Sequence, residues 1–189
     1  SRRQRQMCIR DRRITVRNLP SFVSELGMQL KVPELGLITV DTAFGGDSFV
    51  VVDAATLGFE LIASEAKKLA DLGVAITNLA NQQLSFRHPT NEDWKHFSFC
   101  LFAGPITREG SHITTSHAVA IQPGKIDRSP TGTAVSARMA LLHARGEMQI
   151  GETFTARSII DSEFHGQIAE TMMLGDIPAI IPEITGSAW

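Results

Sequence analysis

The sequence Asp127-Arg128-Ser129-Pro130-Thr131-Gly132-Thr133-Ala134 begins a helix whose apolar side chains face nearly every direction. Pro130 suits a first helical turn, since its fixed φ and missing N–H cost nothing there, and Ser129 is placed to cap the exposed amides. These residues predict a helix that begins at Thr131 or one residue earlier.

The residues that follow predict a helix enclosed by other elements. Its apolar side chains are Ala134, Val135, Ala137, Met139, Ala140, Leu141 and Leu142. Arg145 and Gly146 supply a cationic last turn and a C-terminal stop.

The start of this helix also predicts an anion site. The free amides of Gly132, Thr133 and Ala134 point out of the first turn, where the helix dipole adds partial positive charge. Asp127, just upstream, is placed to accept hydrogen bonds from an ammonium or imino group. An anion site beside a carboxylate fits a zwitterionic amino acid, and the alternative is an ordinary capped helix with a solvated Asp127.

In the rest of the chain, the spacing of apolar residues predicts an α/β fold with a mixed sheet, because the predicted strands and helices do not alternate regularly. Residues 64–82 predict an amphipathic helix with Ser64 as its cap. The predicted strands are 14–16, 28–32, 37–43, 49–53, 97–102, 115–121, 154–160, 164–170 and 179–184.

The composition excludes several classes of protein. The chain has 189 residues, 43% of them hydrophobic and 20% charged, with a formal net charge of −2, so we expect neither a nucleic-acid nor a membrane partner and a cytoplasmic location. Its two cysteines, Cys8 and Cys100, support no disulfide framework, and Cys100 is expected in a buried strand. The histidines lack metal-ligand spacing and no Gly-x-Ser-x-Gly hydrolase motif occurs, so we expect no metal site.

The motif at 127–133 resembles the Asp-Arg-Ser-Pro-Cys-Gly-Thr signature of the proline racemase family, with Thr131 in place of the cysteine. Other segments resemble landmarks of the family and occur in the same order along the chain. The resemblance extends from about Ile14 to the end. These segments are residues 40–46 with 49–54, His88-Pro89 and residues 102–105.

The resemblance implies a cofactor-independent enzyme that acts on an imino acid with two thiols on opposite faces of the α-carbon. A thiol has a pKa of about 8.5 that a helix N-terminus lowers, whereas a threonine hydroxyl is a far weaker acid. Thr131 therefore argues against racemisation. It favours the branch that resembles trans-3-hydroxy-L-proline dehydratase, in which one thiolate removes the α-proton and the 3-hydroxyl leaves.

By this resemblance, Asp127 holds the substrate nitrogen, while Gly132, Thr133 and Ala134 bind its carboxylate. Thr131 occupies the position of the second base. Two alternatives stay open: a proline racemase or hydroxyproline 2-epimerase, and an amino-acid-binding or inactive homologue. No cofactor is expected, and a homodimer is compatible with the sequence.

The first catalytic cysteine of the family lies in a Met-Cys-Gly-His segment, which this chain lacks. Met7-Cys8 resembles it only superficially, because Ile9-Arg10 follows and the spacing to the later motifs is too short. Residues 2–12 resemble a translated sequencing adaptor, and a basic nucleic-acid-binding arm is the alternative.

The family resemblance further implies two similar domains, each a curved mixed sheet around a central helix, with the active site between them. We therefore expect residues 13–189 to be a partial domain, most of the second domain plus a returning segment, truncated at both ends. Such a fragment is expected to lack activity by itself and to expose apolar surface that a missing domain would cover.

Overall fold

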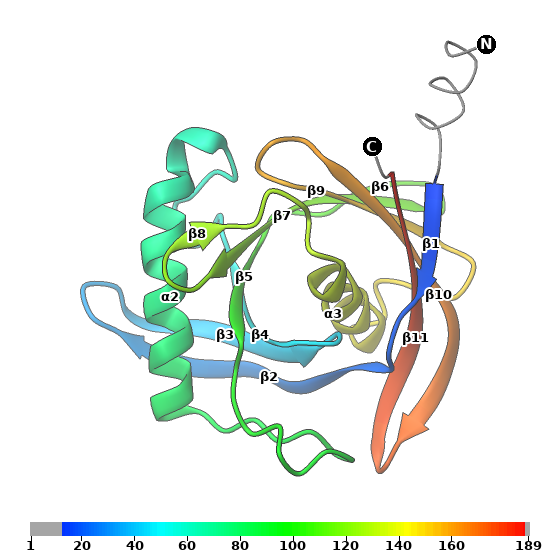
Figure 1. Cartoon of the computed structure of the whole chain (residues 1–189), viewed down its shortest axis with the longest axis horizontal. Coiled ribbons are helices and arrows are strands. Elements are labelled where there is room, and N and C mark those ends of the chain that lie inside the picture. Colours follow the sequence, from blue (N-terminus) through cyan, green and yellow to red (C-terminus); the bar gives the residue numbers. More distant parts are fainter. Residues whose placement is uncertain (1–12, 188–189) are drawn as a thin grey trace, which may run out of the picture.

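A computed structural model of the chain describes residues 13–187, which form a closed mixed sheet around one helix (Figure 1). The enclosed helix is α3 (Gly132–Ala144), and a second helix, α2 (Ala66–Gln83), lies outside the sheet after a short 3₁₀ turn, η1 (Ala63–Glu65). The prediction of an α/β fold with a curved mixed sheet around a central helix is confirmed.

Eleven strands make up the sheet. They are β1 (Arg13–Arg17), β2 (Ser21–Val32), β3 (Gly36–Phe44), β4 (Ser48–Asp53), β5 (Phe99–Ala103), β6 (Thr107–Glu109), β7 (His112–Ile121), β8 (Lys125–Ile126), β9 (Thr153–Arg157), β10 (Glu163–Leu174) and β11 (Ile177–Ser187).

The strand order β1-β11-β10-β9-β7-β5-β4-β3-β2 closes into a barrel because β11 also pairs with β2. Only two residue pairs make this closure, Ala179 with Phe22 and Ile180 with Ser21. The pairs β4–β5 and β7–β9 are parallel and the others are antiparallel, which gives the mixed sheet that the sequence predicted.

Helix α3 lies inside the barrel and is buried on nearly all sides. Val135 and Met139 pack with Phe154 and Ile180 of the strands, while Leu141 packs with a second group of inward-facing side chains. Each fully buried side chain of this size contributes about 1.5–3 kcal/mol to folding. The predicted enclosed helix is thus confirmed, and Arg145 with Gly146 (φ 73°) ends it as expected.

Helix α2 covers the outer face of the barrel over β5, β7 and β8. Gly73 permits this close approach, because a Cβ there would lie 2.2 Å from the Cβ of Ala120 on β7. The predicted amphipathic helix is confirmed, but its predicted start and cap are wrong. The 3₁₀ turn includes Ser64, the α-helix begins at Ala66, and no side chain caps it.

Several strand boundaries differ from the prediction. The first half of β2 and the short strands β6 and β8 were not predicted, since their residues show no strong alternation. Strand β9 ends at Arg157 rather than Ile160, because Ser158 Oγ bonds Ser162 Oγ at 2.6 Å and closes a turn with Asp161 at φ 62°. Cys100 is buried in β5 as expected, and burial raises the pKa of its thiol.

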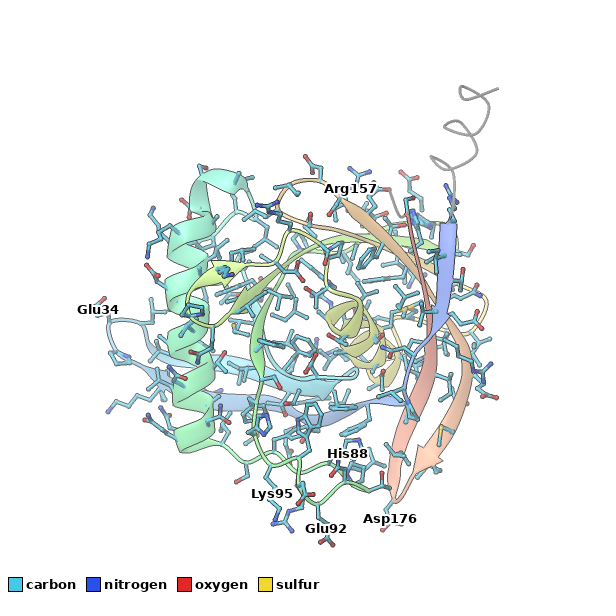
Figure 2. The ribbon with its side chains drawn as sticks, viewed as in Figure 1. Glu34, His88, Glu92, Lys95, Arg157 and Asp176 are labelled. Atoms are coloured by element: carbon cyan, nitrogen blue, oxygen red, sulfur yellow. The ribbon has the colours of Figure 1, made fainter. Side chains whose placement is uncertain are left out.

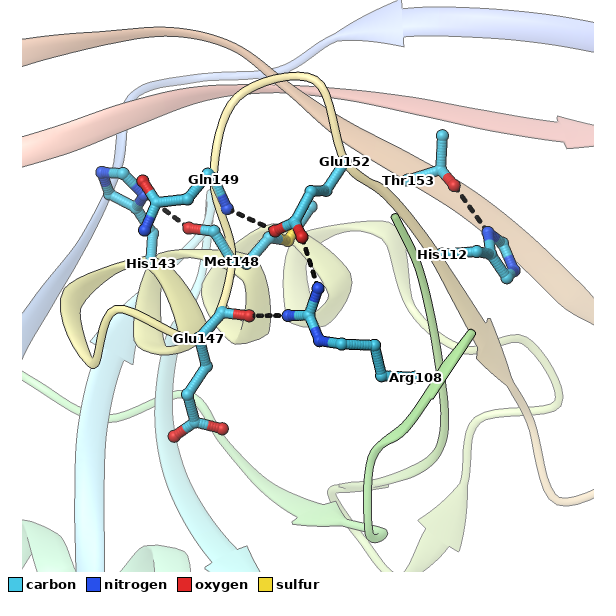
Figure 3. Close-up of polar contacts among 8 residues, drawn as sticks. All are labelled: Arg108, His112, His143, Glu147, Met148, Gln149, Glu152 and Thr153. Atoms are coloured by element: carbon cyan, nitrogen blue, oxygen red, sulfur yellow. Dashed lines mark hydrogen bonds and ion pairs between the residues drawn. The ribbon is translucent and has the colours of Figure 1, made fainter. Parts of the chain in front are cut away.

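The loop that follows α3 is tied to the neighbouring strands (Figure 3). Arg108 donates to the Glu152 carboxylate and to the Glu147 carbonyl, while His143 Nδ1 lies 2.8 Å from the Met148 carbonyl. These contacts anchor the loop at the C-terminal end of α3 to β6. No helix within residues 13–187 is long and apolar enough to cross a membrane.

Candidate active site

The 127–134 motif lies at the N-terminal end of α3, in a turn that differs from a simple capped helix. The helix begins at Gly132, and Thr131 is its N-cap residue with φ 62°. The predicted helical position of Pro130 and the predicted capping role of Ser129 are therefore wrong. Instead, Ser129 Oγ accepts a hydrogen bond from the Thr131 amide at 3.1 Å, before the helix starts.

Asp127 holds this turn together through its carboxylate. Its Oδ1 accepts from the Ser129 amide at 2.9 Å, and its Oδ2 accepts from Ser129 Oγ at 3.1 Å and from Thr131 Oγ1 at 2.5 Å. An ionised carboxylate offers about four acceptor positions, so one remains for a ligand. The alternative, a solvated Asp127, is wrong, because Asp127 is half-buried and its carboxylate accepts hydrogen bonds from its own loop.

The amides of Gly132, Thr133 and Ala134 have no hydrogen-bond acceptor among residues 13–187. They are first-turn donors that a helix leaves unsatisfied, and the helix dipole favours an anion beside them. No atom lies within 4 Å of the position that a Cβ on Gly132 would take, so the approach to these donors is open. The structure thus brings Asp127, Thr131, Gly132 and Thr133 together at the start of α3, with Ala134 fully buried behind them.

Two residues that the sequence did not single out support this turn. Asn18 Nδ2 donates to the Gly45 carbonyl and to Ser136 Oγ, both at 2.8 Å, and Ser136 Oγ donates to the Gly132 carbonyl. Asn18 follows β1 in the chain and lies 118 residues from Ser136, so only the closed barrel brings them together. No local sequence signal could have revealed Asn18.

Asp47, the second such residue, lies in the Gly45-Gly46 turn between β3 and β4 and accepts from Thr133 Oγ1 at 3.4 Å. Burial raises the pKa of Asp47, and the bond from Thr133 and the charge of His96 partly oppose this rise. A Cβ on Gly45 would lie 2.0 Å from the Thr133 carbonyl oxygen, which explains why glycine stands there.

A pocket of about 540 Å³ opens in front of the motif. Its lining includes Asp127, Ser129, Thr131, Gly132 and Thr133, whereas Ala134 is fully buried and does not line it. The apolar lining residues Ile14, Val16, Phe164 and Ile184 are called its rim below. Two rim side chains, Ile14 at 53% and Val16 at 56% exposure, are unusually accessible for aliphatic residues on a strand. The arrangement can hold a small anion at the amides and a cationic nitrogen at Asp127, beside an apolar surface that fits a carbon ring.

The histidines lie outside this pocket. His112 Nδ1 bonds Thr153 Oγ1 at 2.6 Å (Figure 3), and His117 is fully buried in β7 without a hydrogen-bond partner among residues 13–187. Burial, and then the nearby charge of Arg138, lowers the pKa of His117 to about 3. Within the same residues, no group of three or more histidine, cysteine or acidic side chains is arranged to bind a metal ion.

Comparison with known proteins places this geometry in context. The family model described as proline racemase matches residues 3–189. That range includes residues 3–12, which lie outside the described residues, so their origin as an adaptor and any role of Cys8 stay predictions.

Two solved structures are similar over 93% of this chain. One is a hydroxyproline epimerase from Agrobacterium vitis with bound trans-4-hydroxy-L-proline, at 32% identity and a TM-score of 0.85. The other is a probable proline racemase from Agrobacterium radiobacter K84 with bound carbonate, at 33% identity and a TM-score of 0.86.

The chain spans about half the length of these relatives, 49% and 50% respectively. The match of the family model covers nearly all of the chain, and the barrel around a central helix is shared with both solved structures. This chain therefore belongs to the proline racemase family.

Proposed function

We propose that the protein containing this chain binds a cyclic imino acid at the N-terminal end of α3. The substrate carboxylate accepts hydrogen bonds from the amides of Gly132, Thr133 and Ala134, and its positively charged nitrogen donates to Asp127. The three unsatisfied amides and the partly free carboxylate support this orientation. The apolar rim at Ile14 and Val16 suits the ring carbons.

The reaction that we propose is dehydration of trans-3-hydroxy-L-proline. A thiolate supplied outside residues 13–187 removes the α-proton, the C3–O bond breaks, and the hydroxyl leaves as water after it takes a proton. The resulting enamine tautomerises to a cyclic imine, Δ¹-pyrroline-2-carboxylate. Carbon, nitrogen and charge balance, and no oxidant or reductant is required.

One observation carries this choice: the hydroxyl of Thr131, which by the resemblance of its motif takes the position of a racemase's second thiol, donates to Asp127 at 2.5 Å. A threonine hydroxyl engaged in this way does not exchange protons near neutral pH as a thiol does. Elimination needs an α-proton acceptor on one face only, so a non-titrating side chain at Thr131 is compatible with it.

Epimerisation of hydroxyproline is the second candidate, and the bound trans-4-hydroxy-L-proline in the Agrobacterium vitis relative favours it. That reaction requires a proton donor at the face where Thr131 lies. A binding protein without chemistry is the third possibility, and it requires only the amides and Asp127.

The deciding experiment uses the complete protein with trans-3-hydroxy-L-proline, trans-4-hydroxy-L-proline and L-proline, each followed by optical rotation and by trapping of the imine. Imine from the 3-hydroxy compound alone supports dehydration. Loss of rotation without imine supports the epimerase. Calorimetric binding with neither change supports the binding protein and contradicts both enzymes.

A further inference from the structure

A second pocket, of about 600 Å³, lies at the other end of α3 from the motif. Its lining includes Leu141 and Arg145 from the last turns of the helix, together with residues of β3, β4 and the β2–β3 hairpin. No residue lines both this pocket and the pocket at Asp127. The two pockets are therefore separate sites of the same barrel.

Four charged side chains line this second pocket, Asp41, Asp53, Arg138 and Arg145, and among residues 13–187 only one ion pair joins two of them. Arg145 forms an ion pair with Asp41, so these two residues neutralise each other. Asp53 uses its Oδ1 to accept from the amides of Ala55 at 2.9 Å and Thr56 at 3.3 Å, which fixes its carboxylate in the turn after β4.

Arg138 is the cationic side chain of this pocket that forms no ion pair among residues 13–187. Its guanidinium donates to the Gly104 carbonyl at 3.1 Å, and no carboxylate among residues 13–187 lies within ion-pair distance of it. Burial, and then the charge of Arg145, lowers the pKa of Arg138 to about 10, against the opposing effect of the Glu147, Asp53 and Asp41 carboxylates, so the group is still cationic at neutral pH. Arg138 is half-buried, and a partly desolvated cation with spare donors is stabilised by an anion that pairs with it.

The walls around Arg138 are aliphatic. Leu35, Leu37 and Leu57 line the pocket, and Leu37 is 69% exposed at its mouth. An exposed leucine at the rim of a cavity, above an unpaired guanidinium, suits a ligand with an anionic head and an apolar tail.

We propose that this pocket binds a small monocarboxylate with a branched aliphatic chain. The carboxylate accepts hydrogen bonds from Arg138, and the chain lies against the three leucines. The ligand is a monoanion because Asp53, whose carboxylate has no ion-pair partner among residues 13–187, also lines the pocket, and its negative charge opposes a dianion such as inorganic phosphate.

The test uses methyl NMR of the full chain with 4-methylpentanoate as the probe. We expect saturable shifts of the Leu35, Leu37 and Leu57 methyl signals that persist in the presence of excess L-proline, which occupies the other pocket. The neutral analogue 4-methylpentanamide and inorganic phosphate should give no saturable shift. Absence of shifts with 4-methylpentanoate, or equal shifts with phosphate, would overturn the proposal.

Arg138→Gln should weaken the binding at least about tenfold, since it removes a charge-assisted contact. The matched control is Arg157→Gln on the outer edge of the barrel (Figure 2), which changes the net charge equally and should leave binding unchanged. Leu37→Asp adds a carboxylate at the exposed mouth and should also abolish binding. This last variant keeps the test decisive even if Arg138→Gln does not fold, and unchanged binding in it contradicts the proposal.

Discussion

Thr131 has a backbone conformation that threonine rarely adopts. Its φ of 62° is typical of glycine, and such a conformation costs about 1–3 kcal/mol in a β-branched residue. The Asp127 carboxylate, which bonds both the Thr131 hydroxyl and Ser129, offsets this cost and holds the turn. The side chain of residue 131 is thereby presented at the pocket beside the free amides.

The first prediction concerns Thr131→Cys in the complete enzyme. A thiol at the helix N-terminus has a lowered pKa and can protonate the α-carbon from the second face, so we expect epimerisation to appear. Deuterium incorporation at the α-carbon, with chiral separation of the products, measures it. Thr131→Ser is the control and should give no such gain. If the cysteine variant gives no exchange from the second face, residue 131 does not face the α-carbon.

The second prediction separates the structural and binding roles of Asp127. Asp127→Ala should lose the hydrogen bonds to Ser129 and Thr131, which lowers the free energy of unfolding by about 1–3 kcal/mol and abolishes imino-acid binding. Asp127→Asn keeps a carbonyl acceptor for the turn but removes the charge. We expect this variant to unfold nearly as the parent chain does in urea, yet to bind substrate at least about tenfold more weakly in calorimetry. Unchanged affinity in Asp127→Asn would remove Asp127 from the binding site.

The third prediction concerns His117, whose pKa falls to about 3 in the folded chain from about 6.5 in the unfolded chain. Between these values the unfolded state binds the additional proton. The free energy of unfolding therefore decreases as the pH falls below about 6.5, by about 2 kcal/mol at pH 5. Urea titrations at pH 7 and pH 5 measure this loss.

His117→Leu should remove most of that pH dependence, because it leaves no ring to protonate. His96→Leu changes an exposed histidine and serves as the control; it removes a charge near Asp47 but leaves the buried ring of His117, so most of the parent chain's pH dependence should remain. An equal loss of stability at pH 5 in His117→Leu and the parent chain would assign the acid sensitivity to other groups.

At the scale of elements, glycines determine how closely α2 and α3 approach the sheet. A Cβ on Gly45 would lie 2.0 Å from the Thr133 carbonyl oxygen and 2.5 Å from the Ala137 amide nitrogen, both backbone atoms of α3. A Cβ on Gly73 would instead meet the Ala120 side chain on the outer face of the sheet, which α2 covers. The first contact positions the candidate site, whereas the second only packs α2.

The fourth prediction compares these glycines with Gly132. Gly45→Ala should lower the free energy of unfolding by about 1–3 kcal/mol and impair substrate binding, because the first turn of α3 has to shift. Gly73→Ala should destabilise similarly but leave affinity unchanged when measured well below its Tm. Gly132→Ala meets no atom within 4 Å, so it should keep the stability and lose affinity by placing a methyl group in front of the amides. Normal affinity in Gly132→Ala would contradict the proposed carboxylate position.

On the scale of the whole molecule, the barrel closes through a short seam, which is the pairing of β11 with β2. Strands β10 and β11 pair along most of their lengths, but β11 and β2 close the barrel through two residue pairs only. Asn18 reinforces this seam, since its amide donates to the Pro182 carbonyl at 2.9 Å while its side chain bonds Gly45 and Ser136.

The fifth prediction follows from this seam. Amides of residues 179–180 and 21–22 should exchange hydrogen faster than those of residues 165–168, because few bonds have to break to open the closure. Hydrogen exchange followed by mass spectrometry tests this. Asn18→Ala should accelerate exchange at the seam selectively, and Gln29→Ala, on the exposed part of β2, is the control. Uniform exchange across the barrel would contradict a weak seam.

Local patterns were sufficient for the elements that carry strong signals. The all-round apolar pattern of residues 134–142 predicted an enclosed helix because only a buried helix can satisfy it, and the structure confirms this. The amphipathic spacing of residues 64–82 predicted α2, which the structure places at residues 66–83. The helix starts were less predictable, since Ser64 and Ser129 have the chemistry of caps but their loops place them outside that position.

The sequence by itself determined the fold class, the enclosed helix, the family, and the positions of Asp127 and Gly132–Ala134 next to one another, because these depend on residues close together in the chain. Only the tertiary structure decided that Asn18 and Asp47 support the motif, that Arg138 forms no ion pair among the described residues, and that α3 has a pocket at each end. These features join residues that lie far apart in the chain. Their proximity arises from closure of the sheet, which no local periodicity encodes.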